Sequence, residues 1–191
     1  MKKVNKPFNP DKDIIDIRPI SRVFSGESPK NRTERMLNSF LKKRIAIQIG
    51  GITDPAGIYE ERFGITLKIL NMFKTKGDNY PIRISFKGSA FGKNEALDIL
   101  EGYTNLTALI SVSVPESDLV PQIEVGTPSI GERIRLVREL SKLGLRVGLR
   151  LRPILPNISV ERYIKMVEDF KEAGAEILTI EWLRVPRSFT E

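Results

Sequence analysis

The feature that most constrains this chain is a regular alternation of short apolar runs and amphipathic helical segments. Short runs rich in Val, Ile and Leu, bounded by Gly and Pro, are typical of buried parallel strands, and parallel strands need a crossover between them. The alternation therefore predicts βα steps built on a parallel sheet. The apolar runs begin near residues 45, 82, 107, 145 and 176, and helical patterns follow the first four at 59–76, 94–101, 130–143 and 159–173.

The N-terminal part has no such rhythm. Residues 1–12 are polar and contain proline, which predicts a loose arm. Residues 13–20 contain four isoleucines and form a candidate first strand, followed by a loop at residues 21–32. A helix should then continue through Lys43, because Asn31 and Glu34 have the spacing of a capping box. Residues 13–191 are predicted to form one domain.

Two architectures satisfy the alternation: an open doubly wound sheet and a partial (β/α) barrel. A complete eight-fold barrel takes roughly 250 residues, and this chain has 191. With the candidate first strand, the chain has about six strands. We therefore predict an α/β fold that forms a partial (β/α)6 parallel barrel, an incomplete TIM-type barrel.

Alternation within the strands indicates which side chains face the inside of such a barrel. In the run from residue 145, Leu and Val point one way and Arg150 and Arg152 the other, and the second run places Arg83 and Ser85 on one face. Buried charges need partners, so a polar inner face suggests a cavity for an anionic ligand. Arginines on a solvated edge strand would give the same pattern, and both interpretations stay open.

The last run has the same alternation. Thr179 and Glu181 alternate there with Leu178, Ile180 and Trp182, and the apolar set should meet the helices. Trp182 is therefore expected in the core, as is the helical residue Phe170.

Composition excludes several kinds of site. The chain has neither cysteine nor histidine, which removes disulfides, thiolate zinc sites, thiol nucleophiles and cysteine-ligated clusters. Acid–base chemistry would fall to Asp, Glu, Lys or Tyr, and neither a catalytic residue nor a metal site is assigned. The formal charge of +7 favours an anionic partner such as nucleic acid. No apolar run approaches the roughly 18 residues of a membrane span, and a signal-peptide core is absent, so we expect a cytoplasmic protein without membrane contact.

Candidate ligand-binding residues follow the first two strands. In α/β folds ligands sit at the carboxyl ends of the strands, where this chain places Gly50, Gly51, Thr53 and Asp54 after the first run and Lys87 after the second. The glycine pair is not GxGxxG, so a dinucleotide fingerprint is absent. Asp54 is equally suited to accepting hydrogen bonds from backbone donors in its turn.

Two stretches resemble radical S-adenosylmethionine (SAM) enzymes of the spore photoproduct lyase type, a branch that includes DNA repair photolyase-like proteins. The first reads IGGITDP at residues 49–55 and YEERFGITLKIL at 59–70, and resembles the family's second strand and helix. The second reads EVGTPSIGERI at 124–134 and GLRVGLRLRPILP at 144–156, and is similar to its loop, helix and fifth strand. The resemblance spans residues 28–185.

The resemblance implies a six-stranded partial barrel whose first strand precedes a Cys-x3-Cys-x2-Cys loop that holds a [4Fe-4S] cluster. That cluster cleaves SAM to a 5′-deoxyadenosyl radical. By this resemblance, Gly50 and Gly51 would lie at the methionine amino group of SAM, with Thr53 and Asp54 beside them. Lys87 and Ser111 would lie at the methionine carboxylate, and Arg150 and Arg152 at the adenosine or the substrate. Glu124 is also an implied position, an acid without an assigned role.

The cluster loop departs from the family pattern. Residues 21–32 read SRVFSGESPKNR where the cysteines are expected, and without thiolates a cluster cannot be held in the family's manner. Three interpretations stay open. In the first, the chain is a radical SAM domain whose cluster loop is supplied elsewhere. In the second, it is a degenerate barrel that binds nucleic acid, a nucleotide or a protein. In the third, it is a cluster-independent enzyme that uses Asp54, Lys87 or Glu181.

Overall fold

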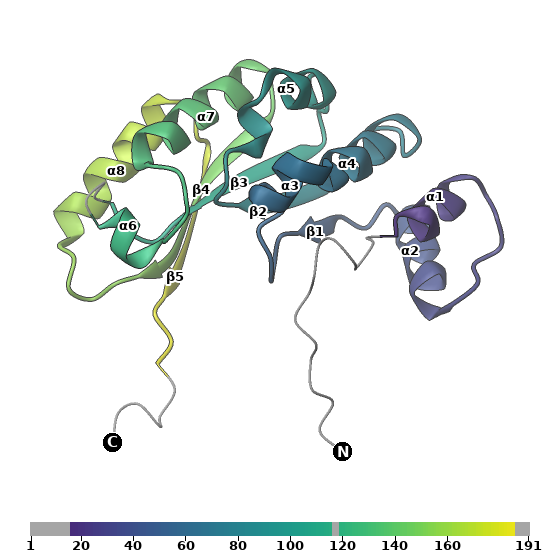
Figure 1. Cartoon of the computed structure of the whole chain (residues 1–191), viewed down its shortest axis with the longest axis horizontal. Coiled ribbons are helices and arrows are strands. Elements are labelled where there is room, and N and C mark those ends of the chain that lie inside the picture. Colours follow the sequence, from purple (N-terminus) through teal and green to yellow (C-terminus); the bar gives the residue numbers. More distant parts are fainter. Residues whose placement is uncertain (1–15, 116–118, 186–191) are drawn as a thin grey trace.

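Five parallel strands form one open sheet in which neighbouring strands follow one another in chain order. The computed structural model describes residues 16–115 and 119–185. Figure 1 shows helices α3 to α8 arched over one face of the sheet, and the other face is concave and carries none of these six helices. The strands are β1 (Ile47–Ile49), β2 (Ile82–Phe86), β3 (Leu106–Val112), β4 (Arg146–Ile154) and β5 (Ile177–Trp182).

This arrangement confirms the predicted fold class. A doubly wound sheet reverses its strand order and carries helices on both faces, whereas this sheet does neither. The described residues hold five strands of a barrel that is not closed. The helices are α1 (Arg18–Phe24), α2 (Arg32–Lys43), α3 (Ile58–Phe63), α4 (Ile65–Thr75), α5 (Asn94–Leu100), α6 (Val120–Ile123), α7 (Ile130–Lys142) and α8 (Val160–Glu172), with a 3-10 turn, η1, at Ala90–Gly92.

Helix starts and the core follow the predictions. The side chains of Asn31 and Ser129 accept hydrogen bonds from the backbone at the starts of α2 and α7, and Ser129 forms a full capping box with Glu132. Val147, Leu149 and Leu151 of β4 are buried in the core, and Phe170 is fully buried. Among the described residues, none of the helices has the length and apolar content that a membrane crossing requires.

The predicted first strand is wrong where the structure describes it. Residues 13–15, like the arm at residues 1–12, lie outside the described residues, but α1 begins at Arg18 and extends into the predicted loop. Pro19 lies in its first turn, where a missing N–H costs nothing and a fixed φ favours the helix.

The single helix predicted at residues 59–76 is two helices. Gly64 adopts a left-handed conformation with φ of 60°, which interrupts the helical ladder. The Glu60 carboxylate caps the start of the second helix, α4, by accepting hydrogen bonds from the backbone N–H groups of Thr66 at 2.7 Å and Leu67 at 2.8 Å. The sequence between the run near residue 107 and the helix at 130–143 has no helical pattern singled out above, yet it contains a short helix, α6.

Trp182 was expected in the core and is 72% exposed. It lies at the end of β5, which pairs with β4 alone among the described strands and forms an edge of the sheet. Leu178 and Ile180, which were expected to meet the helices with it, are also exposed, at 45% and 54%. Alternation carries no information on whether a helix covers that face.

Candidate functional site

A cleft opens on the concave face at the carboxyl ends of the strands. Its cavity of about 370 Å³ brings together eight of the nine residues singled out in the sequence, all except Glu124. These come from loops and strand ends far apart in the chain: Gly50, Gly51, Thr53, Asp54, Lys87, Ser111, Arg150 and Arg152.

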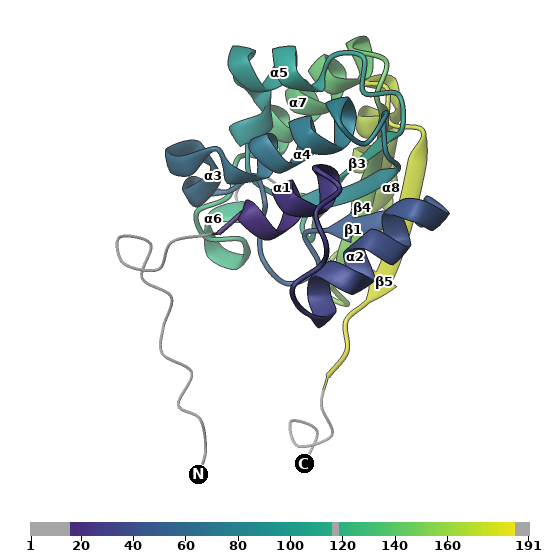
Figure 2. The same ribbon diagram turned by 90° about the vertical axis from the view of Figure 1, so that its right-hand side faces the viewer.

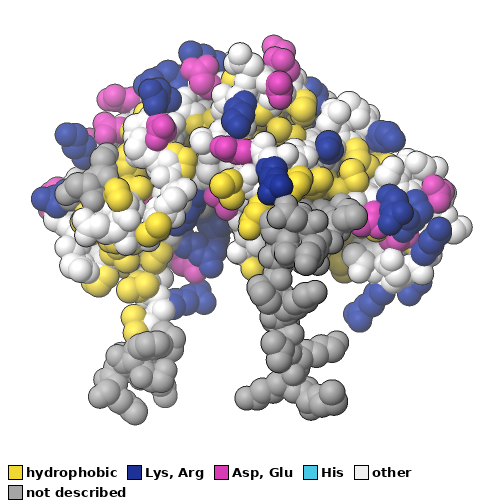
Figure 3. All heavy atoms as spheres, viewed as in Figure 1, with side chains coloured by type: hydrophobic (Ala, Val, Ile, Leu, Met, Phe, Trp, Pro, Cys, Tyr) yellow, Lys and Arg dark blue, Asp and Glu magenta, His cyan; other side chains and the backbone are white. Residues whose placement is uncertain are grey.

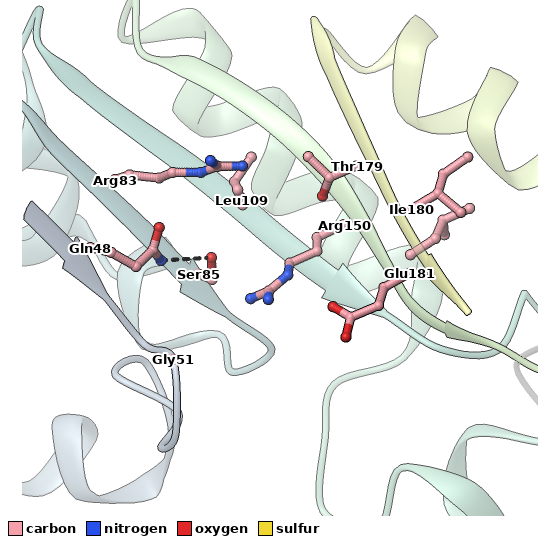
Figure 4. A pocket seen from close by; sticks show the side chains of 10 residues that line it. Gln48, Gly51, Arg83, Ser85, Leu109, Arg150, Thr179, Ile180 and Glu181 are labelled. Atoms are coloured by element: carbon pink, nitrogen blue, oxygen red, sulfur yellow. Dashed lines mark hydrogen bonds between the residues drawn. The ribbon is translucent and has the colours of Figure 1, made fainter. Parts of the chain in front are cut away.

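A second hollow of about 280 Å³ adjoins the first, since Gly51, Ser85 and Arg150 line both. Figure 4 shows this hollow, with Arg83 and Arg150 pointing into it from neighbouring parts of the sheet. It is also lined by Gln48, Leu109, Leu151, Thr179, Ile180 and Glu181.

The loop after β1 lies directly on β2. Gly50 has a φ of +84°, and a Cβ built there would lie 1.9 Å from the carbonyl oxygen of Ser85. A Cβ on Gly51 would meet nothing within 4 Å. The backbone conformation and the contact with β2 therefore require glycine at position 50, whereas position 51 has room for a side chain beside the cleft.

Asp54 is engaged by backbone groups. One carboxylate oxygen accepts from Ala56 N at 3.0 Å, and the other accepts from Gly88 N at 2.8 Å and Lys87 N at 3.2 Å. This confirms the interpretation of Asp54 as an acceptor for backbone donors. The carboxylate ties the β1 loop to the end of β2 and so holds two walls of the cleft together.

Glu124 lies outside the cleft lining, in a buried ionic cluster. Its carboxylate contacts Lys87 Nζ at 2.6 Å and Arg133 at 2.6 Å, and accepts from Ser113 N at 3.0 Å. Burial raises its pKa, but the hydrogen bond from Lys87 and the charge of Arg133 outweigh burial and hold the pKa of Glu124 below its ordinary value. Lys87 thus lines the cleft while its ammonium is bound to an acid from the adjoining loop.

Arg133 completes this cluster and was missed in the sequence. Its guanidinium is fully buried and donates to the backbone carbonyls of Ser111 and Pro128 at 3.0 Å each, and to the Thr127 hydroxyl. An arginine in a helix is usually solvated, so the sequence alone favours an exposed position. Gln48 was also missed, although its place between Ile47 and Ile49 marks it as facing the cleft.

The cleft floor carries an excess of positive charge. Arg152 pairs with Glu181 at 2.9 Å, while Arg83 and Arg150 form no ion pair with any described residue. Burial, followed by repulsion from Arg152 and Arg83, lowers the pKa of Arg150, against the attraction of Glu181. Figure 3 shows basic side chains in the hollow beneath the sheet. A bound anion would relieve this repulsion.

No family model matches the chain. Uncharacterized proteins of Mycobacterium tuberculosis and Mycobacterium bovis are 24% identical over 179 residues, which cover 90% of this chain and 52% of theirs. The chain therefore spans about half the length of the curated relatives it matches.

Solved structures show the fold. A spore photoproduct lyase variant with bound AdoMet and dinucleoside spore photoproduct is 17% identical, with a TM-score of 0.64 over 82% of this chain and 47% of that one. SuiB of Streptococcus suis is 15% identical, with a TM-score of 0.60 over 83% of this chain and 35% of the SuiB chain. The structure of SuiB bound to S-adenosylmethionine has a TM-score of 0.56 over 73% of this chain and 30% of the SuiB chain. This chain shares its fold with both proteins, which confirms the resemblance to the spore photoproduct lyase type at the level of fold.

Proposed function

We propose that the cleft on the concave face binds S-adenosylmethionine. The observation that carries the proposal is the convergence of eight predicted residues, from four strands and their loops, on one cavity of about 370 Å³. The shared fold with SuiB and spore photoproduct lyase, whose structures include one with bound S-adenosylmethionine and one with bound AdoMet, supports it.

The lining suits the chemical parts of SAM. Lys87 is held by Glu124, so we assign the methionine carboxylate to Arg150, a cation of the cleft without an acidic partner among the described residues. The loop of Gly50 to Thr53 would accept the amino group through backbone carbonyls, and Ile52 and Pro153 offer apolar surface for the adenine.

A [4Fe-4S] cluster does not fit the residues present. The 191 residues contain neither cysteine nor histidine, and the described ones contain no group of three acidic side chains placed to hold a metal ion. Radical formation would need a thiolate loop that these residues do not include. The proposed function is therefore binding of SAM, without a reaction assigned to this chain.

Titration calorimetry tests the proposal. We expect SAM to bind the wild-type protein, and Arg150→Gln to weaken binding about 10- to 100-fold, because a hydrogen-bonded charge pair is lost. Arg146→Gln is the matched control, since Arg146 belongs to the same strand but lies at its amino end, outside the cleft lining.

Two outcomes would contradict the assignment. Absence of SAM binding at millimolar concentration would remove the function itself. Equal binding by wild type and Arg150→Gln would remove the role of Arg150 alone. Adenosine, which lacks the carboxylate, should bind both proteins equally.

Binding of nucleic acid is a second candidate, favoured by the unpaired arginines of the floor and the charge of +7. Three phosphate contacts to single-stranded nucleic acid give a slope of log K against log salt of about −2. We therefore expect affinity for a short oligonucleotide to fall about 15-fold between 50 and 200 mM salt. Fluorescence anisotropy measures this, and a flat response would eliminate the candidate.

A further inference from the structure

Strand β5 has a bare edge and an uncovered apolar face. It pairs with β4 on one side, and no described strand pairs with the other. Leu178, Ile180 and Trp182 share one face and are 45%, 54% and 72% exposed. Figure 2 shows β5 running along the rim of the sheet. An exposed apolar edge of this kind is a template for pairing with another strand.

We propose that β5 pairs antiparallel with β5 of a second copy of this chain, about a two-fold axis at Ile180. A two-fold interface must be complementary to itself. In this register Ile180 faces its own copy, and Leu178 faces Trp182 of the second copy. Residues opposite each other in an antiparallel pair share a face, so the two exposed apolar stripes become one.

Charge favours this register over its neighbours. Glu176 and Arg184 are exposed residues that flank β5 at its two ends, and the register sets Glu176 opposite Arg184 of the second copy. A register shifted by two residues toward the N-terminus would set Glu176 opposite Ile180 and Trp182 opposite Gly174. The charge complementarity, which occurs twice across the axis, therefore points to a second copy as the partner.

The inner face of β5 supports the same register. The Thr179 hydroxyl is buried and has no hydrogen-bond partner among the described residues. Glu181 of the second copy would lie opposite it and could accept its hydrogen bond. Both residues line the hollow beside the cleft, so the dimer would bring one carboxylate of the second copy to the border of each site.

Single cysteines test the register, because the chain has none of its own. Opposite Cβ atoms in an antiparallel pair lie about 4.5–5.5 Å apart, near the distance that a disulfide spans. Ile180→Cys should therefore form a covalent dimer under oxidising conditions. Leu178→Cys is the control, since its two copies would lie roughly 13 Å apart along the strands.

Wild-type protein should sediment as a dimer, and Ile180→Cys alone should be cross-linked on a non-reducing gel. A monomeric wild type, or equal cross-linking of both variants, would overturn the proposal.

Charge reversal is an independent test on two exposed residues, of which Arg184 also lies 3.8 Å from Glu181 of its own copy. Glu176→Arg or Arg184→Glu alone sets like charges opposite each other and should raise the dissociation constant of the dimer about tenfold. The double variant restores opposite charges and should return the constant close to that of wild type. Additive weakening in the double variant, measured by sedimentation equilibrium, would contradict the predicted register.

Discussion

Replacement of Gly50 by alanine is expected to destabilise the protein by at least about 3 kcal/mol. The added Cβ would lie 1.9 Å from the Ser85 carbonyl oxygen, and the residue has a φ of +84°. Ser85 lies within β2, whose backbone is held by β1 and β3. Neither a rotamer change nor a small shift can therefore relieve the contact. Urea unfolding measures the loss.

Gly51→Ala is the matched control, one residue away in the same loop. Its Cβ would meet nothing within 4 Å, so we expect its free energy of unfolding to stay within about 0.5 kcal/mol of wild type. Similar losses in the two variants would show that the loop, rather than the contact with β2, determines the effect. Because Gly51 lines the cleft, its variant also reports whether ligand binding tolerates a side chain there.

The fold could be predicted from the sequence where local patterns decide the structure. The predicted start of β2 agrees with the structure, and α5, α7 and α8 agree within a residue or two, because a parallel strand is an apolar run and a helix carries its own caps. Gly64 escaped prediction because its left-handed conformation depends on Glu60 capping the next helix. The exposure of Trp182 depends on what covers an edge strand, which alternation does not describe.

The cleft was predictable for a topological reason. In a parallel sheet all carboxyl ends meet at one edge, so residues that follow different strands converge there. The roles of the charged residues were not predictable, because they depend on pairs distant in sequence. Lys87 and Glu124 are 37 residues apart, and only the folded chain shows that one neutralises the other. The unpaired Arg150 emerges as the cation that remains for a ligand.

Glu124→Gln is expected to cost about 3–5 kcal/mol of stability at pH 7. Glu124 is 4% exposed, and its carboxylate contacts both Lys87 and Arg133, the second of which is fully buried. Glutamine removes the negative charge and leaves Arg133 buried without an acid, while its amide donor would face cationic donors. Urea unfolding of the variant against wild type measures the loss.

The loss should depend on pH in a defined direction. The pKa of Glu124 is held below its ordinary value of 4.5 in the folded protein, so the ionised carboxylate stabilises the fold fully above pH 4.5. Its contribution disappears as the pH falls through the lower, folded pKa. The difference between wild type and Glu124→Gln should therefore be constant above about pH 5 and shrink in more acidic solution.

Glu139→Gln is the control for the loss of a carboxylate as such. Glu139 pairs with Lys142 at 3.1 Å on the exposed side of α7, with side chains 47% and 64% exposed. An exposed pair at this spacing contributes only about 0.3 kcal/mol, so this variant should unfold almost as wild type does at every pH. A loss for Glu124→Gln no larger than that of Glu139→Gln would mean that water reaches Arg133, and that Lys87 is free to take the ligand carboxylate assigned to Arg150.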